Sequence, residues 1–269
     1  MAVHEHPAHP LVLVTGAAGN VGQTVFAGLR PHYALRAFDL RPTPGADDMH
    51  VGDLADRAAV DRAVAGVDTV IHFGGCPRME ADFMRDLVKP NIEGLWHLLD
   101  AARLAGVKRF IFASSTNVAF GATGLPQLTT DTVHVFNPYG ATKAFGENLG
   151  RWFHDTYGMD FLAVRIGYFR GPYADPALRE AWLHRIWLGP KDCAKFFRLA
   201  VAAPSFGYGI AYACSRCPEN YLDLTSARAL IGYEPEETVP DAGRRVNLDD
   251  GGAAGEMRRT GDGERRTAG

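Results

Sequence analysis

The sequence has few of the features that mark disulfide-stapled, membrane-spanning or nucleic-acid-binding proteins. Its 269 residues include only four cysteines, too few for a disulfide framework in a chain of this length. No apolar run reaches the length of a transmembrane helix, and the start MAVHEHPAHP is too polar for a secretory signal. The formal net charge of −3 provides no broad basic surface for nucleic acid or anionic lipid. We therefore expect a soluble protein of the reducing cytoplasm that acts on a small molecule, without nucleic-acid or membrane partners.

Patterns of metal ligands are equally scarce. Cys214 and Cys217 form a single C-x-x-C, and no second ligand pair with the spacing of a zinc site accompanies them. We interpret them as two thiols near the end of a strand. His4, His6 and His9 lie in a terminal segment, and such segments are commonly disordered. The sequence thus predicts no metal site.

What the sequence does contain is a regular alternation of strand and helix patterns. Short apolar runs predict strands, and longer stretches with apolar residues at helical spacing predict helices. Strands that alternate with helices form parallel sheets covered on both faces. We therefore predict an α/β fold, a Rossmann-type doubly wound parallel sheet. The predicted strands include 11–14, 34–40, 68–75, 108–115 and 161–167, and the predicted helices include 21–29, 56–66, 83–105 and 138–157.

After Gly167 the alternation loosens into a segment rich in proline, glycine and aromatic residues. We interpret it as a small substrate-binding region, mainly 168–240, over the carboxyl edge of the sheet, where open α/β sheets bind ligands. A helix is predicted over 193–204, with Asp192 as its N-cap.

The domain boundaries follow from composition. One Rossmann-fold domain is predicted over 11–240, after a flexible N-terminus, 1–10. The last segment, 241–269, is rich in glycine and charge and is predicted to be a disordered tail.

A glycine-rich turn joins the first predicted strand to the first predicted helix. Gly16, Gly19 and Gly22 form G-x-x-G-x-x-G, a variant of the dinucleotide-binding fingerprint. Glycine there permits a tight turn and lets backbone N–H groups approach a pyrophosphate at the helix N-terminus. Asp39 ends the second strand, where a carboxylate accepts hydrogen bonds from the adenosine ribose hydroxyls and repels a 2′-phosphate. Arg41 could attract that phosphate, but the position of Asp39 favours NAD.

Two further strand ends offer contacts to this cofactor. Asp53 and Leu54 follow a short third strand, where the carboxylate could reach the adenine amino group and the leucine could cover the ring. Asp53 is equally suited to cap the helix over 56–66. In HFGG, at 72–75, Gly74 and Gly75 leave room for a cofactor, whereas the histidine is interpreted as a packed residue.

Several motifs occur together in the order of one enzyme family. They are T-G-x-x-G-x-x-G, the acidic strand end, the Asp-Leu pair, HFGG, KPNIEGLWHLLDAAR, FIFASS and Y-x-x-x-K. Over about residues 11–235 the chain resembles the extended short-chain dehydrogenases/reductases, the family of NAD-dependent epimerases and dehydratases. Asn91 resembles a helix asparagine that this family has near the cofactor, although its side chain could equally bond to backbone. The predicted cofactor contacts also include Ala18, Asn20, Val21, Leu40, Phe73, Ala113 and Ile166.

The segment NPYGATKAFGE, 137–147, predicts a capped helix start that places Tyr139 and Lys143 on one helix face. Alone, such a pair is typical of a solvated surface. The resemblance implies that Tyr139 is the general base and that Lys143 lowers its pKa and holds the nicotinamide ribose. The family also uses a hydroxyl just past the fifth strand to hold the substrate oxygen. Ser115 takes that position, and Thr116 is a second candidate because the following V-A-F-G is one residue longer than the family's V-Y-G.

The short region after Gly167 favours a small substrate over a nucleotide sugar. Stretches such as VTGAAGNVG, YGATKAFGENLGRWF and RIWLGPKDCAKFF resemble the uronate dehydrogenases within this family, which oxidise the C1 hydroxyl of a hexuronic acid to a lactone. Those enzymes bind the substrate carboxylate through an arginine. We predict Arg179, or else Arg170, for this role, and each could equally be a solvated surface arginine. Tyr168 stands where that group has a small hydroxyl residue in contact with substrate, and Pro77 stands where it has a serine.

The resulting hypothesis is an NAD-dependent oxidoreductase that oxidises a hydroxyl of a small sugar acid such as a hexuronate. An epimerase or dehydratase that retains its NAD is the alternative, and a non-catalytic dinucleotide-binding sensor is the third. The resemblance also implies a homodimer formed by the helices over 83–105 and 138–157.

Overall fold

Seven parallel strands form one sheet in the computed structural model, which describes residues 10–122, 124–169, 181–217, 219 and 221–239. The strand order is β3-β2-β1-β4-β5-β6-β7, so the direction of winding reverses between β1 and β4. This confirms the predicted Rossmann-type doubly wound parallel sheet. The strands are β1 (Leu11–Thr15), β2 (Ala34–Asp39), β3 (Asp48–Val51), β4 (Thr69–His72), β5 (Arg109–Ser115), β6 (Asp160–Ile166) and β7 (Tyr208–Ala213). The predicted flexible N-terminus and disordered tail, including His4, His6 and His9, lie outside the described residues.

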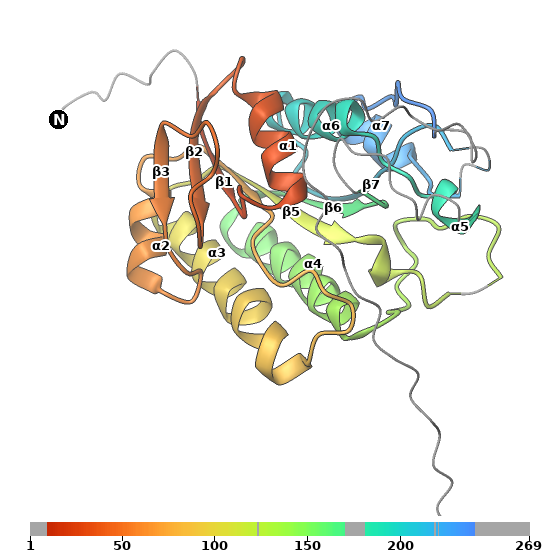
Figure 1. Ribbon diagram of the computed structural model, residues 1–269, viewed down its shortest axis with the longest axis horizontal. Helices are drawn as coiled ribbons and strands as arrows, with labels where there is room; N and C mark the ends of the chain where they lie inside the picture. The colour runs from red at the N-terminus through yellow and green to blue at the C-terminus, as the bar shows by residue number, and fades with distance from the viewer. Residues whose placement is uncertain (1–9, 123, 170–180, 218, 220, 240–269) are drawn as a thin grey trace, which may run out of the picture.

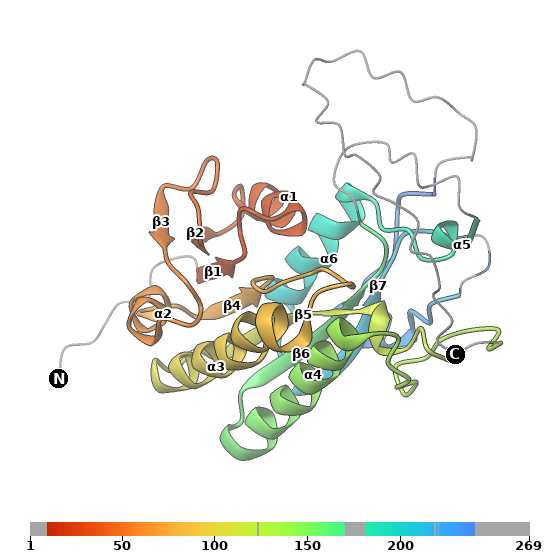
Figure 2. The same cartoon turned by 60° about the horizontal axis from the view of Figure 1, so that its bottom comes forward.

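Helices cover both faces of the sheet. Helices α1 and α6 lie on one face, and α2, α3 and α4 lie on the other (Figure 1 and Figure 2). The helical segments are α1 (Asn20–Leu29), α2 (Arg57–Val64), η1 (Phe83–Glu93), α3 (Gly94–Leu104), η2 (Thr116–Val118), α4 (Pro138–Tyr157), α5 (Ala181–His184), α6 (Pro190–Ala202) and α7 (Thr225–Ile231). Among the described residues, no helix is long and apolar enough to cross a membrane.

The sheet separates two hydrophobic cores. Successive strand residues point to opposite faces, so Val12 and Val14 pack with α1 and α6, whereas Leu13 packs with α2 and α3. Strands buried on both faces read as continuous apolar runs, and this is why the sequence predicted them clearly. The cores hold the carboxyl ends of the strands at one fixed edge.

The predicted helix over 83–105 has two geometries. Its first half, η1, is a π-helix that contains Pro90, and its second half, α3, is an ordinary α-helix. Proline lacks the N–H that an α-helix needs at that position, so the chain there cannot follow the regular i to i−4 pattern. The wider turn carries Asn91 beside the end of β4.

The predicted capping role of Asp192 is wrong. Helix α6 begins at Pro190 with Gly189 as its N-cap, so Asp192 lies inside the first turn and is fully buried. Its carboxylate accepts hydrogen bonds from Ser215 Oγ at 2.6 Å and from the backbone N–H groups of Glu236 and Glu237. Proline at the first helical position moves the start earlier than Asp192.

Candidate active site

One large cavity opens at the carboxyl ends of β1, β4, β5 and β6, where the strand order reverses. Its volume is about 1280 Å³. Pockets for drug-sized ligands measure roughly 300–1,000 Å³, so this cavity can hold a dinucleotide together with a small substrate. Nearly all predicted site residues within the described chain line it: Gly16, Gly19, Asn20, Val21, Gly22, Asp39, Leu40, Asp53, Leu54, Phe73, Gly74, Gly75, Ala113, Ser115, Thr116, Tyr139, Lys143, Ile166 and Tyr168.

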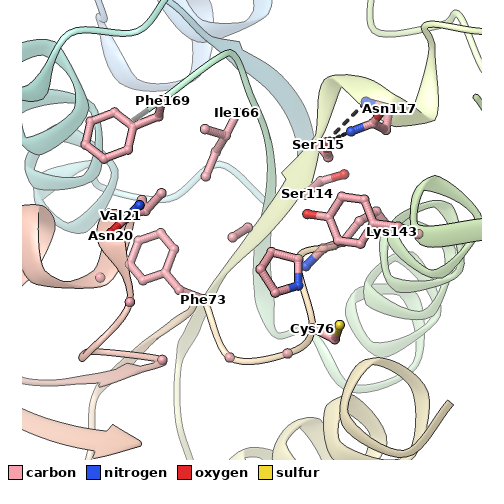
Figure 3. A pocket seen from close by; sticks show the side chains of 18 of the residues that line it. Asn20, Val21, Phe73, Cys76, Ser114, Ser115, Asn117, Lys143, Ile166 and Phe169 are labelled. Carbon is pink, nitrogen blue, oxygen red and sulfur yellow. Dashed lines mark hydrogen bonds between the residues drawn. The ribbon is translucent and has the colours of Figure 1, made fainter. Parts of the chain in front are cut away.

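The glycine-rich turn is shaped for close approach. Gly16 has a φ of +67°, and a Cβ on it would lie 2.6 Å from the backbone nitrogen of Gly74. A Cβ on Gly22 would lie 2.1 Å from the Gly16 carbonyl oxygen. Helix α1 then begins at Asn20 without a side-chain cap, and the residues of its first turn, including Asn20 and Val21, line the cavity (Figure 3). An uncapped helix N-terminus behind a tight glycine turn fits the pyrophosphate of a dinucleotide.

Asp39 is fixed at the cavity wall by the same turn. Its Oδ2 accepts a hydrogen bond from the Ala18 backbone N–H at 2.9 Å, and Arg41 Nη2 donates to the Ala18 carbonyl at 3.0 Å. A carboxylate has several acceptor positions, so Asp39 can still accept from a ribose. Ala18 is itself buried and does not line the cavity, so its contribution is to orient Asp39 rather than to contact a ligand through its side chain.

The capping alternative for Asp53 is wrong. Asp56 is the N-cap of α2 and accepts from the backbone N–H groups of Ala58 and Ala59. Asp53 is exposed and lines the cavity, and its carboxylate accepts from the Ala55 N–H at 3.0 Å. The contact with a cofactor therefore stays a prediction for Asp53 and for its buried neighbour Leu54.

His72 is a packed residue, as predicted. It is buried, and its Nδ1 lies 2.6 Å from Thr15 Oγ1. Burial, and secondarily the charge of Lys143, lowers the pKa of His72 to about 3, so the ring is neutral at physiological pH. Its role is to join β4 to β1 directly below the cavity.

Asn91 does not line the cavity, but it hydrogen-bonds two segments beside it. Its Oδ1 accepts from the Cys76 N–H at 2.7 Å, and its Nδ2 donates to the Cys76 carbonyl and to Thr142 Oγ1. Because Thr142 lies in α4 and Cys76 follows β4, the amide joins these two sides of the cavity. The alternative that Asn91 bonds to backbone is thus seen in the structure.

Tyr139, Lys143 and Ser115 all line the cavity, and Tyr139 is hydrogen-bonded to Ser115. Figure 3 shows Lys143 and Ser115 on the same side of it. Lys143 is buried, and its Nζ lies 5.6 Å from the centroid of the Tyr139 ring. Burial lowers the pKa of Lys143 to about 8. Burial also raises the pKa of Tyr139 to about 12, against the opposing effect of a hydrogen bond from Ser115. Within the protein alone, the pKa of Tyr139 is therefore raised by burial, and the lowering predicted from the neighbouring Lys143 is not seen.

The described part of the substrate end is mostly aromatic and contains an arginine that sequence reasoning missed. Tyr168 lines it, whereas Arg170 and Arg179 lie outside the described residues. Arg185 also lines the cavity, and its guanidinium lies 4.0 Å from the centroid of the Tyr221 ring. The sequence stretch HRIWLGP contains this arginine but has no pattern that separates a pocket arginine from a solvated one. The parallel bridge between Tyr168 and Trp187, with the hydrogen bond from the Ser215 N–H to the Trp187 carbonyl, holds this segment at the site.

Metal-binding clusters and disulfides are both absent from the described residues. Among the described residues, no cluster of three or more His, Cys, Asp or Glu side chains is arranged to hold a metal ion. All four cysteines are described, and all are free thiols. Cys214 and Cys217 follow β7 and are buried, in agreement with the interpretation of two thiols near a strand end.

Comparison with known proteins agrees with this geometry. Residues 12–196 match the model of the NAD dependent epimerase/dehydratase family. The chain is 34% identical over 248 residues to an NAD-dependent glucose-6-phosphate dehydrogenase of Haloferax volcanii, with 84% of this chain and 93% of the relative covered. It is 34% identical to a uronate dehydrogenase of Pseudomonas syringae pv. tomato, with 84% and 82% covered.

A solved structure gives the same result in three dimensions. Uronate dehydrogenase of Agrobacterium tumefaciens, as a tyrosine-to-alanine mutant complexed with NAD, superimposes with a TM-score of 0.76 at 30% identity, with 86% of each chain covered. The fold, the glycine turn and the order of motifs therefore have one explanation: the chain belongs to the NAD-dependent epimerase/dehydratase family, the extended short-chain dehydrogenases/reductases.

Proposed function

We propose that this protein is an NAD-dependent dehydrogenase that oxidises the C1 hydroxyl of a small sugar acid, a hexuronate, to the lactone. The observation that supports this most directly is a cavity that joins a dinucleotide cradle to Tyr139, Lys143 and Ser115. NAD supplies the hydride acceptor when it is bound. The protein supplies the proton acceptor, the orientation of the hydroxyl and the exclusion of water.

Each catalytic role follows from the position of its side chain. Tyr139 takes the proton of the substrate hydroxyl, because its oxygen is at the cavity wall beside Ser115. The positive nicotinamide and the Lys143 ammonium favour the phenolate, and together they offset the burial that raises the pKa of Tyr139. Ser115 donates a hydrogen bond toward the reacting oxygen, and Thr116 is the neighbouring hydroxyl.

Arg185 is the described side chain best suited to hold an anionic group of the substrate. Its Nε lies 2.5 Å from Glu219 Oε2, and the guanidinium has further N–H donors for a carboxylate. Stacking on Tyr221 holds the plane of the guanidinium in place. We therefore propose Arg185 as a third candidate, beside the predicted Arg170 and Arg179, for the arginine that binds the substrate carboxylate.

The decisive experiment measures the reduced nicotinamide band with purified protein, NAD and a panel of hexuronates, an aldohexose 6-phosphate and neutral aldoses. We expect steady formation of reduced cofactor with hexuronates. If only the sugar phosphate is turned over steadily, the protein is a dehydrogenase, but its substrate is a sugar phosphate instead of a hexuronate. Conversion of a sugar without any net absorbance change would identify an epimerase or dehydratase with retained NAD. NAD binding without conversion of any sugar would favour the sensor.

An arginine variant tests the substrate more narrowly. Arg185→Met should raise KM for hexuronates at least about tenfold, because it removes a charge-assisted hydrogen bond worth about 1.5–3 kcal/mol. KM for NAD should remain unchanged in this variant. An unchanged hexuronate KM would leave the carboxylate to Arg170 or Arg179.

We also propose a homodimer that forms through α3 and α4. These helices expose Trp96, Leu104, Phe145, Trp152 and Tyr157, an aromatic face on which the rings of Trp96 and Trp152 stack with centroids 6.2 Å apart. Large exposed apolar patches on a folded protein commonly mark interfaces. The four free thiols suit a reducing compartment, and we propose the cytoplasm.

A further inference from the structure

A chain of side-chain amides connects the start of α4 to the Ser115 hydroxyl. Asn137 caps α4, because its Oδ1 accepts from the Gly140 N–H at 2.8 Å. Asn137 Nδ2 then donates to Asn117 Oδ1 at 3.2 Å, and Asn117 Nδ2 donates to Ser115 Oγ at 3.0 Å. Figure 3 shows Asn117 and Ser115 joined at the cavity wall. The helix that carries Tyr139 is thus hydrogen-bonded, through two asparagines, to the serine opposite it.

The direction of every bond in this chain is determined by backbone groups. The Gly140 N–H can only donate, so Asn137 must present its oxygen to it and its NH₂ group to Asn117. Asn117 must then present its oxygen to Asn137 and its NH₂ group to Ser115. At the other end, the Asn117 backbone N–H also donates to Ser115 Oγ, at 3.2 Å. The Gly140 end thus fixes the orientation of both amides, and the bond at the Ser115 end is compatible with it.

Ser115 consequently accepts two hydrogen bonds, which is all that a hydroxyl oxygen can accept. Its own proton has to be donated. Resting on the proposed function, we propose that Asn117 is a positioning residue that commits the Ser115 hydroxyl to donate toward Tyr139 and the reacting substrate oxygen. A serine free to rotate would spend part of its time as an acceptor and would stabilise neither the phenolate nor a developing alkoxide.

The backbone around Asn117 is built to hold this arrangement. Its carbonyl accepts from the Phe136 N–H at 2.9 Å. A Cβ on Gly140 would lie 2.5 Å from that carbonyl oxygen, so glycine allows α4 to approach the turn this closely. The groups that face Tyr139 are Ser115 from β5, Cys76 from the loop after β4 and Lys143 from its own helix. Asn117 acts on Tyr139 through the first of these.

Two variants test whether Asn117 acts by orienting the Ser115 hydroxyl or only by stabilising the local structure. Asn117→Asp replaces the donating NH₂ group by an acceptor, so that Ser115 donates to the new carboxylate instead of to the reacting oxygen. Asn137→Asp keeps a good helix cap but presents only acceptors to Asn117, whose amide then turns its oxygen to Ser115. We expect kcat to fall on the order of a hundredfold in N117D and about tenfold in N137D, with hexuronate KM changed less than about twofold.

The control carries the same charge change at a site on α4, the helix that Asn137 caps. Asn148 is exposed on α4, and its amide bonds only locally, to the Ala144 carbonyl at 2.8 Å among the bonds of the described chain. Asn148→Asp should leave kcat and KM unchanged. A higher KM with unchanged kcat in N117D would make Asn117 a substrate contact and would overturn the proposal.

A second measurement does not depend on turnover. Alkaline titration of tyrosinate absorbance in the NAD-saturated protein, with Tyr139→Phe as the reference, isolates the titration of Tyr139. We expect N117D and N137D to shift that titration to higher pH and N148D to leave it in place. Unshifted titrations in folded, NAD-binding N117D and N137D would refute the proposal even if no sugar proves to be a substrate. Absence of turnover with shifted titrations would refute only the proposed function.

Discussion

At the scale of single residues, the site shows a conflict between burial and charge. Tyr139 must lose a proton to act as a base, and Lys143 must keep one to assist it. Burial opposes both requirements, since it raises the pKa of Tyr139 to about 12 and lowers the pKa of Lys143 to about 8. A bound NAD would place the positive nicotinamide near Tyr139 and would lower the pKa of its phenol again. Without NAD, Tyr139 is therefore a poor base.

Removal of the phenol tests this account. Tyr139→Phe should lower kcat by about 10²–10⁴-fold, the contribution typical of a positioned general base. NAD affinity, measured by calorimetry, should change little, because the cradle lies at the other end of the cavity. In the wild type, oxidation should be lost as the pH falls below the pKa of Tyr139 in the loaded enzyme, since the base must be deprotonated. A Tyr139→Phe variant with wild-type kcat would assign the proton to another group.

At the scale of elements, a buried ion pair holds α4 against the sheet. Glu147 of α4 and Arg165 of β6 form two parallel hydrogen bonds of 2.8 Å, and Ser114 Oγ also donates to Glu147 at 2.6 Å. Burial alone lowers the pKa of Arg165, but the hydrogen bonds and charge of Glu147 raise it above its usual value. Glu147 lies one helical turn after Lys143, so the pair fixes the depth at which α4 presents its catalytic face.

Breaking this pair on one side leaves a charge without its partner in the core. Glu147→Leu should lower the free energy of unfolding by about 3–5 kcal/mol, and the double variant with Arg165→Leu should recover much of that loss. Urea unfolding followed by circular dichroism measures both. Arg151 and Asp155, an exposed pair 3.5 Å apart on α4, provide the control, and Arg151→Ala should cost less than about 1 kcal/mol. Equal losses in the single and double variants would contradict this account.

At the scale of the whole molecule, the cavity and the exposed aromatic face are on different parts of the fold. The cavity is lined by residues at the carboxyl ends of the strands, whereas the exposed Trp96 and Trp152 belong to α3 and α4, which cover one face of the sheet. Figure 2 shows α3 and α4 side by side on that face. The proposed association through these helices would therefore leave the cavity open.

Charges on the aromatic face should prevent this association. We expect the wild type to sediment as a dimer and the double variant Trp96→Asp, Trp152→Asp to sediment as a monomer that still binds NAD. Leu125→Asp, at an exposed leucine in the loop before α4, is the control and should remain dimeric. A monomeric wild type at micromolar concentration would exclude the proposed homodimer.

The sequence by itself determined the fold and the cofactor end of the site. Parallel strands buried on both faces appear as apolar runs, and a tight turn with a φ of +67° at Gly16 requires glycine, so both leave a local signal. The strand end at Asp39 and the capped start of α4 are local for the same reason.

Only the tertiary structure decided the rest of the site. Arg185 reaches the cavity because a bridge from Tyr168 to Trp187 folds its segment over the sheet edge, and that pairing has no local pattern. Asn117 became significant because Gly140, far along the chain, lets α4 approach it. The conformation of the backbone depends mainly on neighbouring residues, whereas the partner of a side chain depends on packing between segments that are distant in the sequence. The cofactor cradle is built mainly from local backbone conformation, and the substrate end is built from contacts between distant segments.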